Sequence, residues 1–165
     1  MFRQCSILEN INMENIDISS VQNMIGLFQD CNKLKSIDLS NLDTSKVIDM
    51  AQMFSYCSNL EHINFGNINT SSVKNMESLF TKCSKLKSIN ISYLDTSQVT
   101  SMGNMFSGCS NLEYVNFGNT SSVKTMGSLF SGCSKLRSID ISNLDTSQVT
   151  SMGNMFSGCS NLEYV

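Results

Sequence analysis

Cysteine has the widest chemistry of any residue type in this sequence, because a thiolate can bind a metal, attack an electrophile or form a disulfide. The number of cysteines is odd, and no C-x-x-C pair is present. The single histidine, His62, cannot complete a set of zinc sites. We therefore predict buried free thiols, with no metal and no other cofactor. The cysteines are Cys5, Cys31, Cys57, Cys83, Cys109, Cys133 and Cys159.

The spacing of the cysteines predicts how they are positioned. Successive cysteines are 26 residues apart, except for one step of 24 residues from Cys109 to Cys133. Such a period is typical of a solenoid, in which each coil buries its apolar side against its neighbours. We expect residues 1–165 to form a single array of five full 26-residue coils, one 24-residue coil and partial coils at both ends. The chain opens and stops inside a repeat, so we expect a fragment of a longer protein.

The apolar pattern changes its period inside every coil. From Leu86 to Ile91, alternation and β-branched residues predict a short strand. From Val99 to Phe106, apolar residues recur at steps of three, three and one, which predicts a two-turn helix with its cap at residues 95–97. The predicted fold is an α/β, right-handed solenoid with one short parallel strand and one short helical segment per coil. We expect the methionine and phenylalanine stripe to be core packing.

Charge and composition exclude several classes of function. The net charge is −3 and the sequence pI is about 5.0, so no basic surface predicts binding to nucleic acid or to an anionic membrane. No apolar run approaches the ~20 residues of a membrane helix, so no transmembrane segment is expected in this chain. No catalytic triad, phosphate loop or isolated carboxylate pair stands apart from the repeat, which predicts a protein that is not an enzyme.

One column of the repeat alternates in charge, and this alternation reveals a longer period. When coils are counted from Cys5, the odd coils from Cys57 onward carry Ser-Asn-Leu-Glu, and the even coils carry Lys-Leu-Lys or Lys-Leu-Arg. The unit of duplication is therefore a doublet of about 50–52 residues. We interpret the charges as a device that fixes the register of the stack, since a slip by one coil would place like charges together. The column is Glu9, Lys35, Glu61, Lys87, Glu113, Arg137 and Glu163.

The coil that begins at Cys109 is two residues short. Asn67-Ile68-Asn69-Thr70 of an earlier odd coil becomes Asn119-Thr120. We expect a local bulge or bend there.

Outward positions of the predicted strands form the best candidate contact surface. They are mostly small and polar, with a few larger side chains as anchors, and tyrosine is a common recognition residue. An ordinary solvated sheet face remains the alternative. The candidate binding residues are His62, Asn64, Asn90, Tyr114, Asn116 and Tyr164.

Hydroxyl residues form another set of columns, at the corner after the strand. Their expected role is to satisfy backbone groups at each tight corner. A regular hydroxyl lattice that binds an ordered surface such as ice or a polysaccharide is a minor alternative. The first column is Thr44, Thr70, Thr96 and Thr146, and serine follows each of these threonines.

Two segments resemble a known family. Phe106 to Phe117 reads F-S-G-C-S-N-L-E-Y-V-N-F, and Ser142 to Phe156 reads S-N-L-D-T-S-Q-V-T-S-M-G-N-M-F. These units resemble the BspA-like leucine-rich repeats of microbial surface proteins, including those of mycoplasma surface lipoproteins. The resemblance covers essentially the whole chain. It implies a leucine-rich-repeat solenoid that is extracellular or on the cell surface and takes part in adhesion.

Two functional hypotheses follow. The first is a non-catalytic surface or adhesion module that binds a protein or glycan of another cell or matrix through its exposed strand face. The second is a structural repeat protein that assembles end to end into filaments or a surface layer. Identical segments at 97–115 and 147–165, together with ends that lack polar caps, motivate this homo-association.

Overall fold

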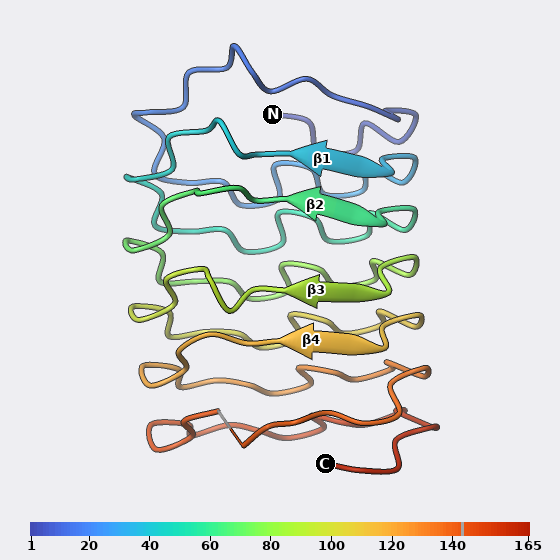
Figure 1. The fold of residues 1–165 in the computed structure, drawn as a ribbon. Coiled ribbons are helices and arrows are strands. Elements are labelled where there is room, and N and C mark those ends of the chain that lie inside the picture. Colours follow the sequence, from blue (N-terminus) through green and yellow to red (C-terminus); the bar gives the residue numbers. More distant parts are fainter. Residues whose placement is uncertain (143) are drawn as a thin grey trace.

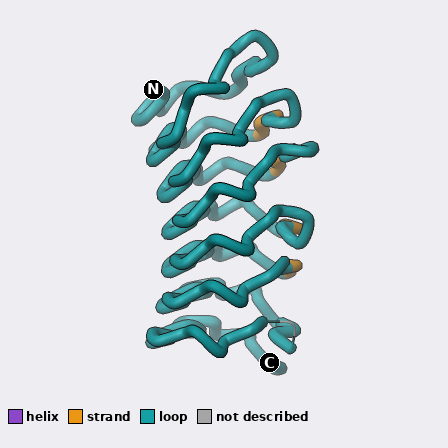
Figure 2. The backbone as a smooth tube through the Cα atoms, turned by 90° about the vertical axis from the view of Figure 1, so that its left-hand side faces the viewer, coloured by secondary structure: helices purple, strands orange, loops and turns teal. Residues whose placement is uncertain are grey.

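The computed structural model describes residues 1–142 and 144–165, which form a stack of superposed coils (Figure 1). Four three-residue strands lie on one wall: β1 Ser36–Asp38, β2 His62–Asn64, β3 Ser88–Asn90 and β4 Tyr114–Asn116. Figure 2 shows these strands gathered along one edge of the stack, while turns and loops make up the rest of each coil. The predicted repeat solenoid is confirmed. We name each coil by its cysteine.

The opposite wall, which we call the turn wall, is bonded without interruption from coil to coil. It comprises residues 23–31 and the matching residues of later coils. Parallel bridges run Asn23–Asp49–Asn75–Ser101–Thr125–Ser151. Alternate amides of the turn wall donate to the next coil, as from Met76 to the Ser101 carbonyl at 3.0 Å and from Phe80 to the Met105 carbonyl at 2.9 Å. The intervening amides close turns within their own coil.

The predicted helix from Val99 to Phe106 is wrong, and no helix occurs in the described residues. Met102 donates its amide to the Thr125 carbonyl of the next coil, so this amide cannot make the i→i−4 hydrogen bond of an α-helix. Asn104 adopts a φ of +56°, which is incompatible with a right-handed helix. The steps of three come instead from consecutive turns. The prediction that this stripe is core packing is correct, because Val99, Met105 and Phe106 are fully buried.

Stacked phenylalanine rings form the centre of the core. Seven rings, from Phe2 to Phe156, lie one above another with centroids 5.4–5.8 Å apart and interplanar angles of 14° or less. Leucine, methionine and cysteine side chains pack around them. Because the two faces of a ring are covered by the rings of neighbouring coils, a single coil cannot bury its own core.

On the strand wall, unlike the turn wall, strand pairing occurs only within pairs of coils, and isolated bonds such as Lys135 N–H to the Ser110 carbonyl at 3.2 Å cross between the pairs. β1 pairs with β2, β3 pairs with β4, and Ser138 pairs with Tyr164, all in parallel. Within the described residues, no strand pairing joins β2 to β3 or β4 to residues 138–140. Figure 1 shows β2 and β3 farther apart than β1 and β2. The coils therefore form doublets, as the alternation of the sequence predicted, and we call the openings between doublets joints.

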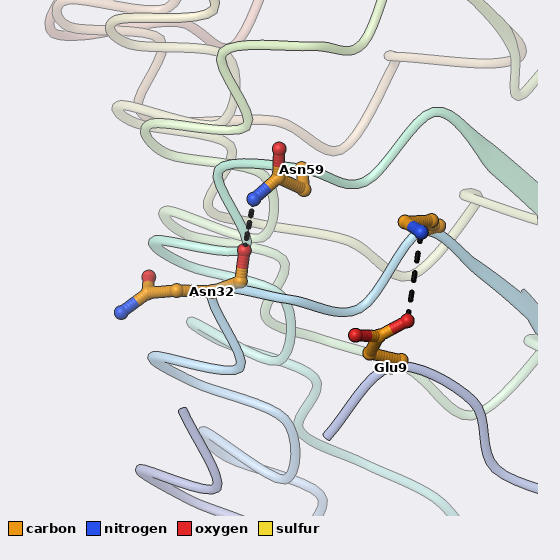
Figure 3. A network of polar contacts seen from close by, with 4 residues as sticks. Glu9, Asn32 and Asn59 are labelled. Carbon is orange, nitrogen blue, oxygen red and sulfur yellow. Dashed lines mark hydrogen bonds and ion pairs between the residues drawn. The ribbon is translucent and has the colours of Figure 1, made fainter. Parts of the chain in front are cut away.

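A side chain found only in odd coils ties each doublet together. The Asn59 amide donates to the Asn32 carbonyl of the preceding even coil at 2.6 Å (Figure 3). Asn111 and Asn161 make the same bond to Ser84 and Ser134. Even coils carry lysine at this position: Lys33, Lys85 and Lys135. The Ser-Asn-Leu-Glu motif is thus the part of the repeat that binds backward within its doublet.

The alternating charges contribute less to register than the sequence suggested. Lys35 and Glu9 form an ion pair at 3.5 Å (Figure 3), and no other ion pair occurs in residues 1–142 and 144–165. Both partners are more than half exposed, and such pairs contribute only ~0–1 kcal/mol. Register depends instead on the backbone bonds of the turn wall and on the asparagine ties.

A glycine allows close contact inside the first complete doublet. Gly66 follows β2 with a φ of +56°, and a Cβ atom there would collide with the Cα and Cβ of Ser40. A Cβ atom added to Gly153, which lies on the turn wall, would have no neighbouring atom within 4 Å.

We predict that Gly66→Ala lowers the free energy of unfolding by roughly 1–3 kcal/mol, because it adds both backbone strain and a steric clash. Gly153→Ala is the matched control and should change stability by less than about 0.5 kcal/mol. Chemical denaturation of the two variants measures both effects. Equal stability of the two proteins would contradict the close packing of β1 and β2.

Candidate binding face

The predicted binding residues lie on the outward side of the strand wall, which we call the strand face. In each doublet a serine pairs with a larger ring: Ser36 with His62, Ser88 with Tyr114, and Ser138 with Tyr164. Tyr114 is 58% exposed and Tyr164 is 72% exposed. The rings thus lie two coils apart, separated by small serine side chains, so each ring is accessible from the side as well as from above.

In the second outward column of the strand face, which includes Asn64 and Asn90, most side chains accept hydrogen bonds from the turn that follows the strand. Asn64 Oδ1 accepts the Gly66 amide at 3.0 Å, and Asn90 Oδ1 accepts the Ser92 amide at 3.0 Å. Hydrogen bonds from Ser40 keep the pKa of Asp38 below its ordinary value. The bond from the Ser40 side chain has the larger effect, and the bond from the Ser40 amide has the smaller one. Asn64 and Asn90 are therefore turn caps as well as surface residues.

Asn116 differs from the other residues of its column. Within the described residues its side chain makes no hydrogen bond, although Asn64 and Asn90 occupy the same position. Asn116 leads into the shortened connection of the Cys109 coil, which reaches the buried Thr120 in fewer residues. The shortened coil thus loses a turn cap, and the bulge or bend expected there stays a prediction. As a result the Asn116 carboxamide is available to a ligand.

Two hollows lie at the joint after β4, and their linings contain residues that are consecutive in sequence, Glu113 and Tyr114 on one side and Arg137 and Ser138 on the other. One, of about 320 Å³, lies between Tyr114–Phe117 and Ser138–Asp140, with Leu144 also in its lining. The other, of about 490 Å³, is lined by Glu113, Lys135, Arg137 and Asn161. We call the two hollows together the joint site. It brings Tyr114 and Asn116 together with the charged Glu113, Arg137 and Asp140, while His62 and Asn90 lie on other coils.

The base of the joint site is firmly supported by the core. The ring of Phe117 packs edge-on against Phe106 and Phe130, with centroids 6.0 and 5.8 Å away. Val115 and Ile139 are buried beside it. The sequence predicted Tyr114 and Asn116 as binding residues and placed Glu113 and Arg137 in the charge column, but Glu113, Arg137 and Asp140 were not predicted to belong to a binding site. The shortened coil was the available signal, since it marks where the repeat becomes irregular.

Another hollow opens at the joint after β2. Its volume is about 460 Å³, and its lining includes Asn64, Gly66, Ile68 and Tyr93. Tyr93 is 54% exposed and replaces an asparagine of the repeat. Two of the joints thus share an exposed tyrosine beside an opening.

The threonine column does not form a surface lattice along the body of the stack. Thr44, Thr70 and Thr96 are buried, whereas Thr146 is exposed. Thr44 donates to the Asn69 carbonyl of the next coil at 2.8 Å, and Thr96 makes the equivalent bond to Asn119. The predicted role in satisfying backbone groups is confirmed for these two residues. The hydroxyl-lattice alternative is wrong for the three buried threonines.

The thiols lie in one column, as predicted, and all seven are free. Five are buried, whereas Cys5 and Cys159 are half-buried. Each thiol from Cys31 onward donates to the carbonyl of a phenylalanine 27 or 29 residues earlier in the chain, as Cys57 does to Phe28 at 3.1 Å. Burial raises the pKa of Cys57 and of Cys133 to about 12 and that of Cys83 far above its ordinary value. These thiols are therefore poor nucleophiles at neutral pH.

We predict that the raised thiol pKa values make the fold sensitive to alkali. A group that is harder to ionise in the folded state has no effect on the pH dependence of the free energy of unfolding below its pKa in the unfolded state, which is about 8.5 for cysteine. Between that pH and about 12, each such thiol should lower the free energy of unfolding by about 1.4 kcal/mol per pH unit. Denaturant titrations at a series of pH values measure the slope.

Cys57→Ala provides the control for this prediction, because lysines and tyrosines also titrate in the same range. In this variant the free energy of unfolding should fall less steeply with pH in the alkaline range, by the about 1.4 kcal/mol per pH unit that one thiol contributes. This difference in slope is expected whatever the variant does to stability at pH 7. An unchanged slope would contradict a buried, neutral Cys57.

Two further observations concern metal binding and membrane insertion in residues 1–142 and 144–165. No group of three histidine, cysteine or acidic side chains is placed to hold a metal ion there. No helix in the same residues has the length and apolar character required to cross a bilayer.

The stacked coils, the parallel strands on one wall and the leucine-lined core define a solenoid of the leucine-rich-repeat type. The chain belongs to the family described as "Mycoplasma protein of unknown function, DUF285", whose model matches residues 1–115 and 83–164. The family match and the structural similarity described next together support the resemblance to BspA-like repeats.

Among solved structures, the chain is similar to a leucine-rich repeat protein from Bacteroides ovatus ATCC 8483. The identity is 25% and the TM-score is 0.50, over 85% of this chain and 39% of that protein. This chain thus spans about two fifths of the length of that relative. A TLR13–ssRNA13 complex matches at 18% identity with a TM-score of 0.35, over 88% of this chain and 23% of that one. No curated protein is significantly similar.

Proposed function

We propose that this chain is a non-catalytic recognition module of a microbial surface protein, and that it binds a protein or glycan of another cell or matrix through the strand face. The observation that carries the proposal is the set of exposed rings repeated along that face. Tyr114 and Tyr164 are more than half exposed on a rigid wall, and aromatic anchors of this kind dominate recognition surfaces. A rigid scaffold also lowers the entropic cost of binding.

The chemistry of the described residues supports binding over catalysis. The column of thiols is buried and hard to ionise. On the strand face, the Asp38 and Asp140 carboxylates accept hydrogen bonds from Ser40 and Ser142, which lower their pKa values. Such carboxylates are fixed as turn caps and are poor proton donors at neutral pH.

Surface placement is the second part of the proposal. It is supported by membership of the mycoplasma family and by the similarity to the Bacteroides repeat protein. An array of this kind presents a long recognition wall without needing a deep pocket. Adhesion is then the sum of several shallow contacts along the stack.

We predict that the double variant Tyr114→Ala, Tyr164→Ala weakens binding to cultured host cells and to immobilised matrix proteins and glycans by about tenfold or more, because it removes both aromatic anchors. Flow cytometry and surface plasmon resonance with purified residues 1–165 measure the loss. Tyr56→Ala is the matched control, since Tyr56 is an exposed tyrosine on the turn wall. Adhesion that survives the double variant unchanged would exclude the strand face as the binding surface.

A further inference from the structure

The joint after β4 exposes a free strand edge inside the stack. In a parallel ladder, the main-chain groups of alternate residues face opposite neighbours. The Asn116 carbonyl accepts the Ile91 amide at 2.9 Å, so Tyr114 and Asn116 direct their main chains toward β3. The main chain of Val115 must then face the joint. Its N–H and C=O have no strand partner within the described residues.

The far side of the same joint is also unpaired. Ile139 donates its amide to the Tyr164 carbonyl at 3.2 Å, so its main chain faces the Cys159 coil. By the same alternation, the main-chain groups of Ser138 and Asp140 face back toward β4. The 320 Å³ hollow lies between the two edges, and its volume is at the small end of the range for ligand sites.

Unpaired edges of this kind recruit extended chains. A row of free N–H and C=O groups is a template for another strand, and several peptide-binding domains work by adding a strand to an open edge. A peptide backbone supplies the donors and acceptors in the required alternation, whereas a glycan supplies hydroxyls with no such repeat. The edge therefore favours a peptide over a sugar.

We infer that the joint site binds an extended peptide segment, whose main chain pairs with the free edge of β4 at Val115. This inference rests on the proposed function and specifies its ligand class and location. Tyr114 packs against a peptide side chain at the rim, and the Asn116 carboxamide hydrogen-bonds the peptide main chain. Glu113 and Arg137 favour peptide residues of opposite charge beside them.

The joint after β2 provides an internal comparison. There the alternation also leaves β2 without a pair on its β3 side. The corresponding asparagine, Asn64, is bonded to Gly66 and to Asp38, and a histidine replaces the tyrosine. This joint lacks the available carboxamide and has His62 in place of Tyr114, although Tyr93 lies beside its opening, so peptides should prefer the β4 joint.

The test begins with a phage-displayed random dodecapeptide library, selected on immobilised residues 1–165. Selected peptides are synthesised and then N-methylated at one backbone amide at a time. We expect methylation at one or two central positions to weaken binding by about tenfold or more, with little effect toward the peptide ends, because the main chain of Val115 is the only part of β4 that faces the joint. Tyr114→Ala should weaken binding by a similar factor, and Tyr56→Ala should leave it unchanged.

Several outcomes would overturn the inference. They are the absence of any selected peptide, binding that tolerates every N-methylation, binding indifferent to Tyr114→Ala, and displacement of bound peptide from the site by a glycan array ligand. Thermal melts confirm that each variant is folded. If cell and matrix binding still depends on Tyr114 and Tyr164 while no peptide binds, the peptide inference alone fails. If that dependence is absent, the proposed function fails as well.

Discussion

Hydrogen bonding between coils is the constraint on which the rest of this structure depends. On the turn wall, alternate amides such as those of Met76 and Phe80 find their acceptors in the next coil. A coil therefore cannot satisfy its own backbone, just as it cannot cover its own phenylalanine ring. Both requirements are met only when identical positions of successive coils lie over one another. This explains why the sequence repeats so closely.

The two walls meet this constraint differently, and the difference gives the molecule its binding surface. The bridges of the turn wall are continuous, whereas strand pairing on the strand wall is interrupted at the joints. Asparagine ties such as Asn59 to Asn32 close each doublet but are replaced by lysine at the next step. The openings therefore follow from the two-coil period. At the shortened Cys109 coil, the opening coincides with an aromatic ring, an available carboxamide and a cluster of charges.

Much of this fold could be predicted from the sequence, because a repeat predicts its own register. The alternation at Ile89 and Ile91 correctly indicated strands, and the odd number of cysteines without C-x-x-C pairs correctly indicated free thiols. The helix at Val99–Phe106 was wrong, because steps of three between apolar residues also arise from successive turns. Gln52 and Ser78 adopt the same left-handed backbone as Asn104 in their own coils, so the residue type at this position gives no consistent signal.

The candidate site could be predicted only in part. Alternation identified Tyr114 and Tyr164 as outward residues, and both are exposed. The commitment of Asn64 and Asn90 to turns depends on backbone geometry that their residue types do not determine. The charge column predicted that Glu113 and Arg137 lie in neighbouring coils, but the hollow between them depends on the width of the joint. Strand pairing in doublets decides that width, and the residue pattern does not specify it.

Residue-resolved amide hydrogen exchange tests the central claim most directly, because it reads coil-to-coil bonding at each position. The account predicts strong protection along the turn wall, including Met76, Phe80 and Met102, and strong protection of Ile91 within its doublet. Amides that face a joint, such as those of Val115 and Ser138, should exchange much faster in the absence of ligand. Uniform protection of the strand wall across the joints would contradict the account, and so would a turn wall that exchanges as fast as the joints.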